Sequence, residues 1–354
     1  MPVSDAALIE AWMKVLRLSK LERGQVVTVL TSQSTHPQTL RAALTAVEMM
    51  GARVNRLDLP PVNGDKALSR DSLAYIGTTP LTGNAAAIAA LKASDLVLDL
   101  MTLLFSPEQA EVLETGTKIL LAVEPPEVLL RMVPTEADRH MVNEAGDLIA
   151  AAKEMHVTSA AGTDIRFKLG DFHVTREYGF VDEPGRWDHW PSGFVAGYPN
   201  EGTAEGKIVL DVGDILLPQK CYLTTPVELT VEQGYVREIK GEVDADLLID
   251  YVASFDDPEA YAISHIGWGL QSRARWSTLG LYDREATIGM DARAFAGNFL
   301  FSLGPNNEGG GSRITACHLD IPMRNCTVEV DGRRVVDDGS VVPTDATMAA
   351  EAAE

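Results

Sequence analysis

Along its first 155 residues the chain alternates short apolar runs with longer segments in which apolar residues recur at helical spacing. The short runs are rich in β-branched and aliphatic residues, and they predict buried strands over residues 25–32, 52–59, 96–101 and 118–124. The longer segments predict helices over residues 1–22, 37–50, 84–92, 106–114 and 135–153. Strands that alternate with helices are typical of a parallel sheet with right-handed crossovers.

The pattern changes near residue 155. From His156 onward, short segments of alternating polar and apolar residues are separated by turn residues. This pattern is typical of half-buried antiparallel strands. We therefore expect a Rossmann-like α/β domain with a parallel sheet over residues 1–155, followed by an α+β, β-rich domain over residues 156–343. The low-complexity tail over residues 344–354 is expected to be disordered.

Composition excludes several classes of partner. The 354 residues carry a formal net charge of −21 without a basic stripe, which argues against nucleic acid. The apolar run LVLDLMTLLF is interrupted by Asp99 and is shorter than the roughly 18 residues that a membrane span needs. The N-terminus does not resemble a signal peptide. Cys221, Cys317 and Cys326 are odd in number and lack CxxC spacing, which favours a reducing compartment. We expect a cytoplasmic protein without a membrane partner.

The segment ITACHLDIPM places an imidazole and a carboxylate two residues apart in an apolar, strand-like context. Residues i and i+2 of a strand point to the same face, so His318 and Asp320 would converge while Leu319 turns into the core. Two such side chains can ligate a metal ion. The spacing also fits a simple hydrogen bond between His318 and Asp320, and on the motif alone both interpretations stay open.

Two further histidines lie in informative contexts. His265 lies in AISHIGWGL, where the glycines indicate close approach of the backbone to another group, although a buried structural histidine fits the same pattern. His189 lies in GRWDHWPSG, which we interpret as a loop dense in aromatic and turn residues. Flanked by Trp187 and Trp190, His189 could line the pocket of a planar ligand. Alternatively, this loop packs at a subunit interface.

The segment NFLFSLGPNNEGGGSR predicts a strand followed by a glycine-rich loop. Ser302 would share a strand face with Leu300 and is a candidate to reach a pocket. The glycines at 309–311 lack the Lys-Ser/Thr of a P-loop, so we expect a turn beside the site. The sequence has no GxSxG or HExxH motif, which removes the commonest hydrolase signatures.

Five segments after residue 155 resemble, in the same order, the thermophilic-type metallo-aminopeptidase superfamily. They are GTDIRFKLGD, PSGFVAGYPNEGTAEGKIVLD, SHIGWG, GNFLFSLG and ACHLDIPM. Together they span roughly residues 155–330, and the N-terminal α/β pattern also suits that superfamily. The resemblance implies a β-rich catalytic domain that binds metal.

The site residues depart from that superfamily, whose members hold two metals in a carboxylate-rich cage. By this resemblance Phe194 and His265 replace glutamates and Leu300 replaces a histidine, while His318 and Asp320 are kept. Two histidines and one carboxylate form the facial triad of mononuclear non-haem iron(II) enzymes. Zinc can take the same ligands. The apolar replacements would line a drier pocket suited to an aromatic ring, which favours Fe(2+) as the cofactor.

Over nearly the whole chain, the sequence resembles the ring-cleaving dioxygenases of bacterial nicotinate and nicotine degradation. The triad contexts carry this resemblance, together with the segments GRWDHWPSG and FLFSLGPN. It implies an oxidoreductase that uses O2 and Fe(2+) to open 2,5-dihydroxypyridine to N-formylmaleamate. Proton transfers need a group with a pKa near neutral, and our candidate for the catalytic acid or base is His189, because it is the non-ligand histidine in an aromatic loop near the pocket segments. The residues expected to contact the substrate are Ser302, Leu104, Phe105, Phe194 and Leu300.

Two other functions remain as alternatives. A metal-dependent hydrolase of the aminopeptidase type would cleave peptides without O2, but the residues at 194 and 300 lack the family's ligands. A non-catalytic binding protein on a decayed scaffold would have scrambled ligands, whereas all three here lie in matching motif contexts. The resemblance also implies a homo-oligomer, whose number of subunits the sequence leaves open.

Overall fold

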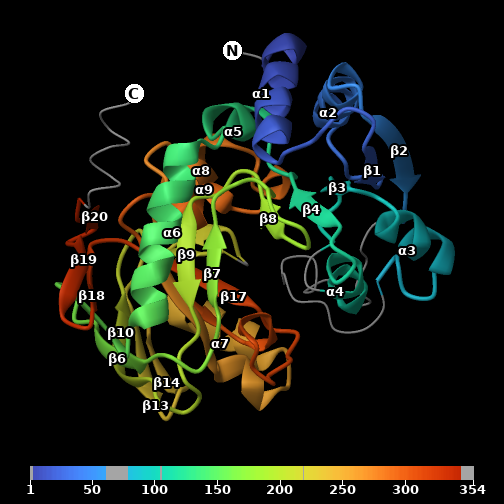
Figure 1. Cartoon of the computed structure of the whole chain (residues 1–354). Coiled ribbons are helices and arrows are strands. Elements are labelled where there is room, and N and C mark those ends of the chain that lie inside the picture. The colour runs from blue at the N-terminus through green and yellow to red at the C-terminus, as the bar shows by residue number, and fades with distance from the viewer. Residues whose placement is uncertain (1–2, 61–78, 104–105, 218, 344–354) are drawn as a thin grey trace. The chain divides into compact units, whose positions relative to one another are not determined.

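The computed structural model describes residues 3–60, 79–103, 106–217 and 219–343, which fold into two compact units with sheets of their own (Figure 1). Unit 1 comprises Met1–Glu136, Glu177–Ser192 and Tyr282–Met290. Unit 2 comprises Ala137–Arg176, Gly193–Leu281 and Asp291–Glu354. The predicted parallel α/β region and the predicted β-rich region are both present. The tail over residues 344–354 lies outside the described residues.

Unit 1 is built on a five-stranded sheet with the strand order β2-β1-β3-β4-β8, and all neighbouring strands run parallel. The strands are β1 (Val26–Thr31), β2 (Arg53–Asp58), β3 (Leu96–Asp99), β4 (Lys118–Leu121) and β8 (Trp187–His189). β3 and β4 are buried along their whole length, as inner strands of a parallel sheet usually are. The first four strands confirm the hydrophobic runs that predicted them.

The helices described in unit 1 are α1 (Asp5–Leu18), α2 (Pro37–Met49), α3 (Ala85–Lys92), α4 (Pro107–Leu113) and α5 (Pro126–Arg131). All but α5 were predicted. α1 begins later than expected because the Ser4 side chain accepts a hydrogen bond from the Ala7 amide and caps the helix there. α3 and α4 pack on one face of the sheet through an apolar cluster that includes Leu30, Val97 and Ile119.

The segment around His189 corrects the prediction of a loop, because residues 187–189 form strand β8 and extend the parallel sheet beside β4. A run of three residues with a central aspartate gives little strand signal. Asp188 is nevertheless fully buried, and its charge is compensated by Arg186 at 2.7 Å. Residues 282–290 also join unit 1, where the buried Glu124 carboxylate accepts hydrogen bonds from the Thr287 hydroxyl and the Met290 amide.

Unit 2 contains two large sheets. An eight-stranded sheet has the order β14-β13-β10-β6-β5-β18-β19-β20, with every neighbouring pair antiparallel. Its strands are β5 (Glu154–Ser159), β6 (Asp164–Lys168), β10 (Glu205–Leu210), β13 (Val227–Glu232), β14 (Tyr235–Gly241), β18 (Cys326–Val330), β19 (Arg333–Asp337) and β20 (Ser340–Val341). A hairpin of β11 (Ile215–Leu216) and β12 (Cys221–Tyr222) is separate.

The second large sheet has the order β17-β16-β15-β9-β7 and carries the predicted metal ligands. Its strands are β7 (Val174–Glu177), β9 (Phe194–Gly197), β15 (Ile263–Gly269), β16 (Phe299–Leu303) and β17 (Leu319–Met323). Strands β9, β15, β16 and β17 are buried along their whole length, so both faces of this sheet are covered.

The helices associated with unit 2 are α6 (Glu136–Ala151), α7 (Val243–Ala253), α8 (Thr278–Leu281) and α9 (Met290–Ala294). The first division between the units follows Glu136, the first residue of α6, and is not near residue 155. The reason is that α6 packs against β9, where a side chain at Gly197 would lie 2.7 Å from Ile149. Figure 1 shows α6 running alongside β7 and β9.

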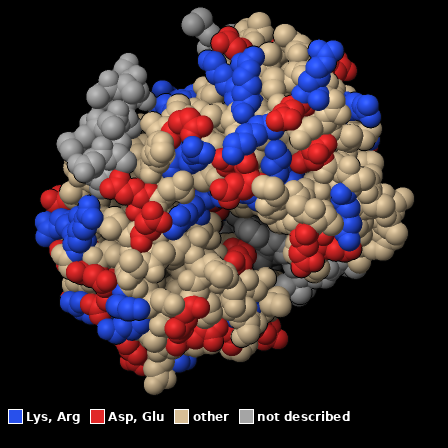
Figure 2. Space-filling model, viewed as in Figure 1, with Lys and Arg blue, Asp and Glu red and all other residues tan. Residues whose placement is uncertain are grey.

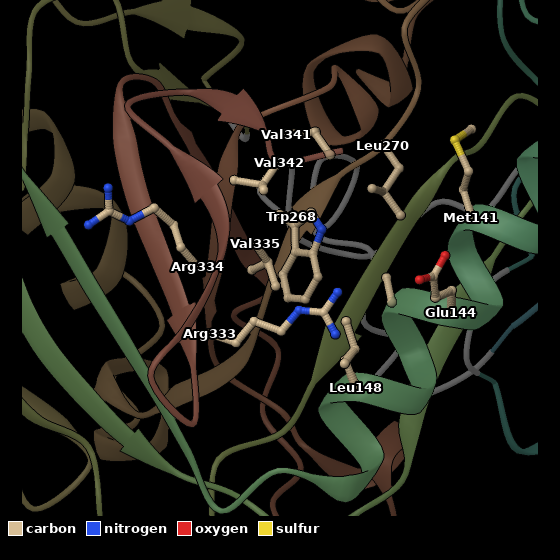
Figure 3. Close-up of a pocket in the computed structure, with 11 residues that line it drawn as sticks. Met141, Glu144, Leu148, Trp268, Leu270, Arg333, Arg334, Val335, Val341 and Val342 are labelled. Carbon is tan, nitrogen blue, oxygen red and sulfur yellow. The ribbon is translucent and has the colours of Figure 1, made fainter. Parts of the chain in front are cut away.

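A pocket in unit 2 opens between α6, the end of β15 and the β19–β20 hairpin (Figure 3). Its lining is mainly apolar, with Trp268 at the centre, and Glu144, Arg333 and Arg334 supply charge. Trp268 pairs with Phe299, the neighbour of Leu300 along β16, so its side chain lies on the opposite sheet face from Leu300. This pocket is therefore separate from the face that carries the predicted metal ligands.

The surface in Figure 2 shows acidic side chains interspersed with lysine and arginine. None of the helices in the described ranges is both long enough and apolar enough to cross a bilayer. The cytoplasmic location and the homo-oligomeric state stay predictions.

Asp214 offers a test of buried charge in unit 2. Its carboxylate accepts hydrogen bonds from the Asp211 and Arg324 amides, but burial dominates and raises the pKa to about 7. An unfolded aspartate has a pKa of about 3.9, so the native state binds the extra proton between these values. This carboxyl should therefore lower the stability as pH rises from about 4 to about 7, with no further change above.

We expect urea unfolding of the Asp214→Asn variant to lack this component. The stability difference, wild type minus variant, should fall by on the order of 2 kcal/mol between about pH 5 and pH 7. Parallel stability curves for the two proteins would contradict the raised pKa of Asp214.

Candidate metal centre

Three neighbouring strands bring the predicted ligands together. β15 carries His265, β17 carries Asp320, and His318 lies directly before β17. β16 runs between them and pairs Ser302 with Asp320. Sheet pairing thereby brings His265 next to ligands more than fifty positions later in the sequence.

The ligand atoms form a nearly equilateral triangle. His265 Nε2 lies 3.3 Å from Asp320 Oδ1, His318 Nε2 lies 3.3 Å from the same oxygen, and the two imidazole nitrogens are 3.4 Å apart. Adjacent ligands at about 2.1 Å from an octahedral ion stand roughly 3 Å apart. The triangle is therefore close to one face of an octahedron, the arrangement in which two histidines and one carboxylate hold non-haem iron(II).

The Asp320 carboxylate is fixed through its other oxygen. Arg293 Nε donates a hydrogen bond to Oδ2 at 2.6 Å, and both side chains are buried. Oδ1, which faces the two imidazoles, has no hydrogen bond of good geometry within the described part of the chain. Burial would raise the pKa of Asp320, but Arg293 and His318 hold it well below its usual range. An ionised buried oxygen that faces two imidazole nitrogens fits a cation.

A β-bulge in β15 lies next to His265. The register between β15 and β16 shifts between Ile263 and Ile266, where β15 contains an extra residue. Bulges re-aim side chains and often lie beside active sites. The His265 ring lies edge-on to Tyr198, with centroids 5.9 Å apart, and edge-on to the His318 ring at 5.6 Å. These contacts orient the imidazole that the bulge presents.

The predicted pocket residues of unit 2 share the ligand face of the sheet. Ser302 is opposite Asp320, and Leu300 follows on the same face two residues away. Gly267 pairs with Leu300, and Gly269 pairs with Phe194, so Phe194 also points to this face. All three side chains are buried. The sheet face that carries the triad thus also carries one hydroxyl and two apolar side chains.

Comparison with known proteins assigns the family. Residues 7–343 match the family described as NicX, 2,5-dihydroxypyridine 5,6-dioxygenase. A protein named 2,5-dihydroxypyridine 5,6-dioxygenase from Pseudomonas putida is 52% identical over 349 residues, which cover 99% of this chain and 100% of the relative. The chain belongs to this family.

Solved structures support both the family and the scaffold. The chain matches the solved structure of 2,5-dihydroxypyridine dioxygenase from Pseudomonas putida KT2440 with a TM-score of 0.94 and 52% sequence identity. The match covers 98% of this chain and 100% of the solved one. AmpT from Thermus thermophilus matches with a TM-score of 0.62 and 15% identity, covering 96% and 99%. At this low identity the second match shows the fold alone, and it confirms the aminopeptidase-type scaffold predicted from the sequence.

His189 lies in unit 1, at the end of β8, within a second buried cluster. Its Nδ1 donates a hydrogen bond to the Pro191 carbonyl at 2.7 Å, and its Nε2 contacts the Glu177 carboxylate. Burial lowers the pKa of His189, but the Glu177 charge outweighs burial and raises it. The Asp188 carboxylate accepts hydrogen bonds from the Arg186 guanidinium and the Tyr178 amide, so it is a poor metal ligand. The remaining two groups of the cluster, His189 and Glu177, can share a proton.

Sequence reasoning missed three partners of the predicted residues, namely Arg293, Glu308 and Glu177. Arg293 and Glu177 are buried, and each of the three contacts a predicted histidine or aspartate that lies at least ten residues away in the sequence. Glu308 directly precedes the glycine run that we placed beside the site, and this was the one available signal. The predicted substrate residues Leu104 and Phe105 lie outside the described residues.

Proposed function

We propose that this family member is an Fe(2+)-dependent dioxygenase that opens the ring of 2,5-dihydroxypyridine with O2 to give N-formylmaleamate. The observation that carries the proposal is the triangle of His265, His318 and Asp320, in a family whose relative bears the name of this activity. Imidazole and carboxylate ligands on one face suit non-haem Fe(2+).

Bound Fe(2+) would supply a position for O2 beside the substrate and a path for electrons from the ring to oxygen. The chain's own residues prepare that site. The Arg293 guanidinium keeps Asp320 ionised and directs Oδ1 toward the metal position. Phe194 and Leu300 exclude water from the ligand face, and exclusion of water strengthens electrostatic interactions there. Within the described part of the chain, the Ser302 hydroxyl makes a long 3.4 Å contact with the Leu303 carbonyl, and it is our candidate to hydrogen-bond a substrate oxygen.

In this proposal His189 is the proton donor and acceptor. Its Nδ1–H is held by the Pro191 carbonyl, which can only accept, so the second proton lies between Nε2 and Glu177. The Glu177 charge raises the pKa of His189, so the pair holds this proton more tightly than a free imidazole would, which suits a general acid.

The hydrolase alternative lacks support in the ligand set. Phe194 and Leu300 offer no metal ligand on the sheet face, and a second metal would need additional carboxylates there. The apolar side chains also suit a flat aromatic ring better than a charged peptide N-terminus.

The test is O2 consumption on addition of 2,5-dihydroxypyridine to protein loaded anaerobically with Fe(2+), compared with metal-free and zinc-loaded protein. The proposal expects one O2 per substrate with iron alone, and a product with the mass of N-formylmaleamate. Peptide cleavage without O2 uptake would reject the dioxygenase and restore the hydrolase.

Replacement of His189 by alanine should lower turnover by about 10²–10⁴-fold, because positioned acid–base groups contribute about that much. Iron content should stay at the wild-type level, since His189 is not one of the three proposed ligands. The exposed His140 provides the control, and His140→Ala should keep both turnover and iron. Loss of iron in His189→Ala would instead identify His189 as a ligand.

A further inference from the structure

The Glu308 carboxyl lies behind His318, on the side of the ring away from the other ligands. His318 directs Nε2 toward His265 and Asp320, and its Nδ1 lies 3.8 Å from Glu308 Oε1. The two nitrogens of one imidazole thus face the metal position and a carboxylate. At 3.8 Å the second contact is longer than a hydrogen bond, so it acts as a charge–dipole contact in a buried site.

The carboxyl itself is held from the other side. Tyr198 donates a hydrogen bond from its hydroxyl to Glu308 Oε2 at 3.1 Å. Oε1 is buried and has no hydrogen-bond donor within the described part of the chain. A buried carboxylate oxygen without a donor is costly, and the nearby Nδ1–H of His318 is a suitable donor.

The backbone next to Glu308 also fits this arrangement. A side chain at Gly309 would lie 2.3 Å from the Tyr198 ring, so only glycine lets Tyr198 pack where its hydroxyl reaches Glu308. The same tyrosine ring contacts His265 edge-on. One tyrosine therefore connects the carboxyl behind His318 with the second histidine.

We propose that Glu308 is a positioning residue of the metal centre, whose carboxylate accepts a hydrogen bond from the Nδ1–H of His318 when metal is bound, closing the 3.8 Å contact, and thereby fixes the ring with Nε2 toward the metal. This rests on the proposed metal centre but not on the identity of the reaction. Metal-binding histidines commonly donate their second N–H to a carboxylate, which sets the tautomer and raises the basicity of the ligating nitrogen. Loss of such a partner typically weakens metal affinity by about 10–100-fold.

The first experiment measures the zinc dissociation constant of metal-free protein by competition with a chelator, without substrate or O2. Glu308→Ala should bind zinc about 10–100-fold more weakly than wild type. Glu308→Gln keeps an acceptor oxygen and should recover most of that loss. The exposed Glu232 is the control, and Glu232→Ala should bind as wild type does. Wild-type affinity in Glu308→Ala, or equal losses in the alanine and glutamine variants, would overturn the proposal.

A second readout separates positioning from a general packing role. In zinc-loaded protein labelled with ¹⁵N-histidine, the Nδ1–H of His318 should give a resonance protected from exchange with water. Glu308→Ala should lose this protection while the folded backbone spectrum is kept, and Glu308→Gln should retain it. Protection that survives in Glu308→Ala would show that another group holds the ring. Failure of O2 uptake in wild type would reject the dioxygenase and leave this comparison valid.

Discussion

Asp320→Ala should abolish both metal binding and O2 uptake, with a loss of activity on the order of 10³-fold or more, because it removes the charged ligand of the triad. The same change should also destabilise the fold. Arg293 would remain buried without the carboxylate that it contacts at 2.6 Å. Breaking a buried ion pair from one side typically costs about 3–5 kcal/mol. Metal content by mass spectrometry and urea unfolding measure the two effects.

A double variant separates these two losses. In Asp320→Leu/Arg293→Met both charges are replaced by apolar side chains, and such replacements of buried pairs are often neutral or stabilising. We expect the double variant to regain most of the stability that Asp320→Ala loses, yet to stay free of iron and inactive. Retention of iron by either variant would remove Asp320 from the ligand set. Equal instability of both would show that the loss does not come from breaking the Asp320–Arg293 pair.

The α/β half of the fold could be predicted because its signals are local. The runs 25–32 and 96–101 are short, apolar and bounded by turn residues, and they became β1 and β3. β8 could not be predicted in this way. Its three residues are a strand because β4 offers a free parallel edge, and that edge is made by a segment about 70 positions earlier. The assignment of α6 to unit 2 likewise depends on packing against β9.

The ligands could be proposed from the sequence because H-x-D has a geometric meaning within one strand. His318 and Asp320 converge for that reason, and the family resemblance supplied His265. Their partners could not be found in this way. Arg293, in α9, and Glu308, in a short 3-10 helix, reach the ligands through the tertiary fold, and sequence periodicity does not predict a pairing of this kind. The charged residues that contact the ligands are thus harder to predict from the sequence than the ligands themselves.

The glycines of SHIGWG indicated close approach of the backbone, and the structure identifies the neighbour as another strand. A side chain at Gly267 would lie 1.9 Å from the Val195 carbonyl oxygen and 2.8 Å from the Ala196 Cα. Both are backbone atoms of β9, so no rotamer change can relieve the contact. The glycine therefore lets β9 and β15 pair closely, only two residues from His265.

Gly267→Ala should consequently cost about 3 kcal/mol or more, at the upper end of what overpacking usually costs. For a protein of this size that corresponds to a fall in Tm of about 4 °C or more. Gly280→Ala is the matched control, because a side chain at Gly280, in helix α8, meets nothing within 4 Å. The control should melt at or slightly above the wild-type temperature, since alanine favours helix.

Because β9 and β15 carry Phe194 and His265, we also expect Gly267→Ala to bind zinc more weakly at temperatures where it stays folded. A variant that melts with wild type would mean that β9 can move away from β15 without cost, and a variant that melts early with unchanged zinc affinity would mean that the bulge at His265 is independent of this strand pairing.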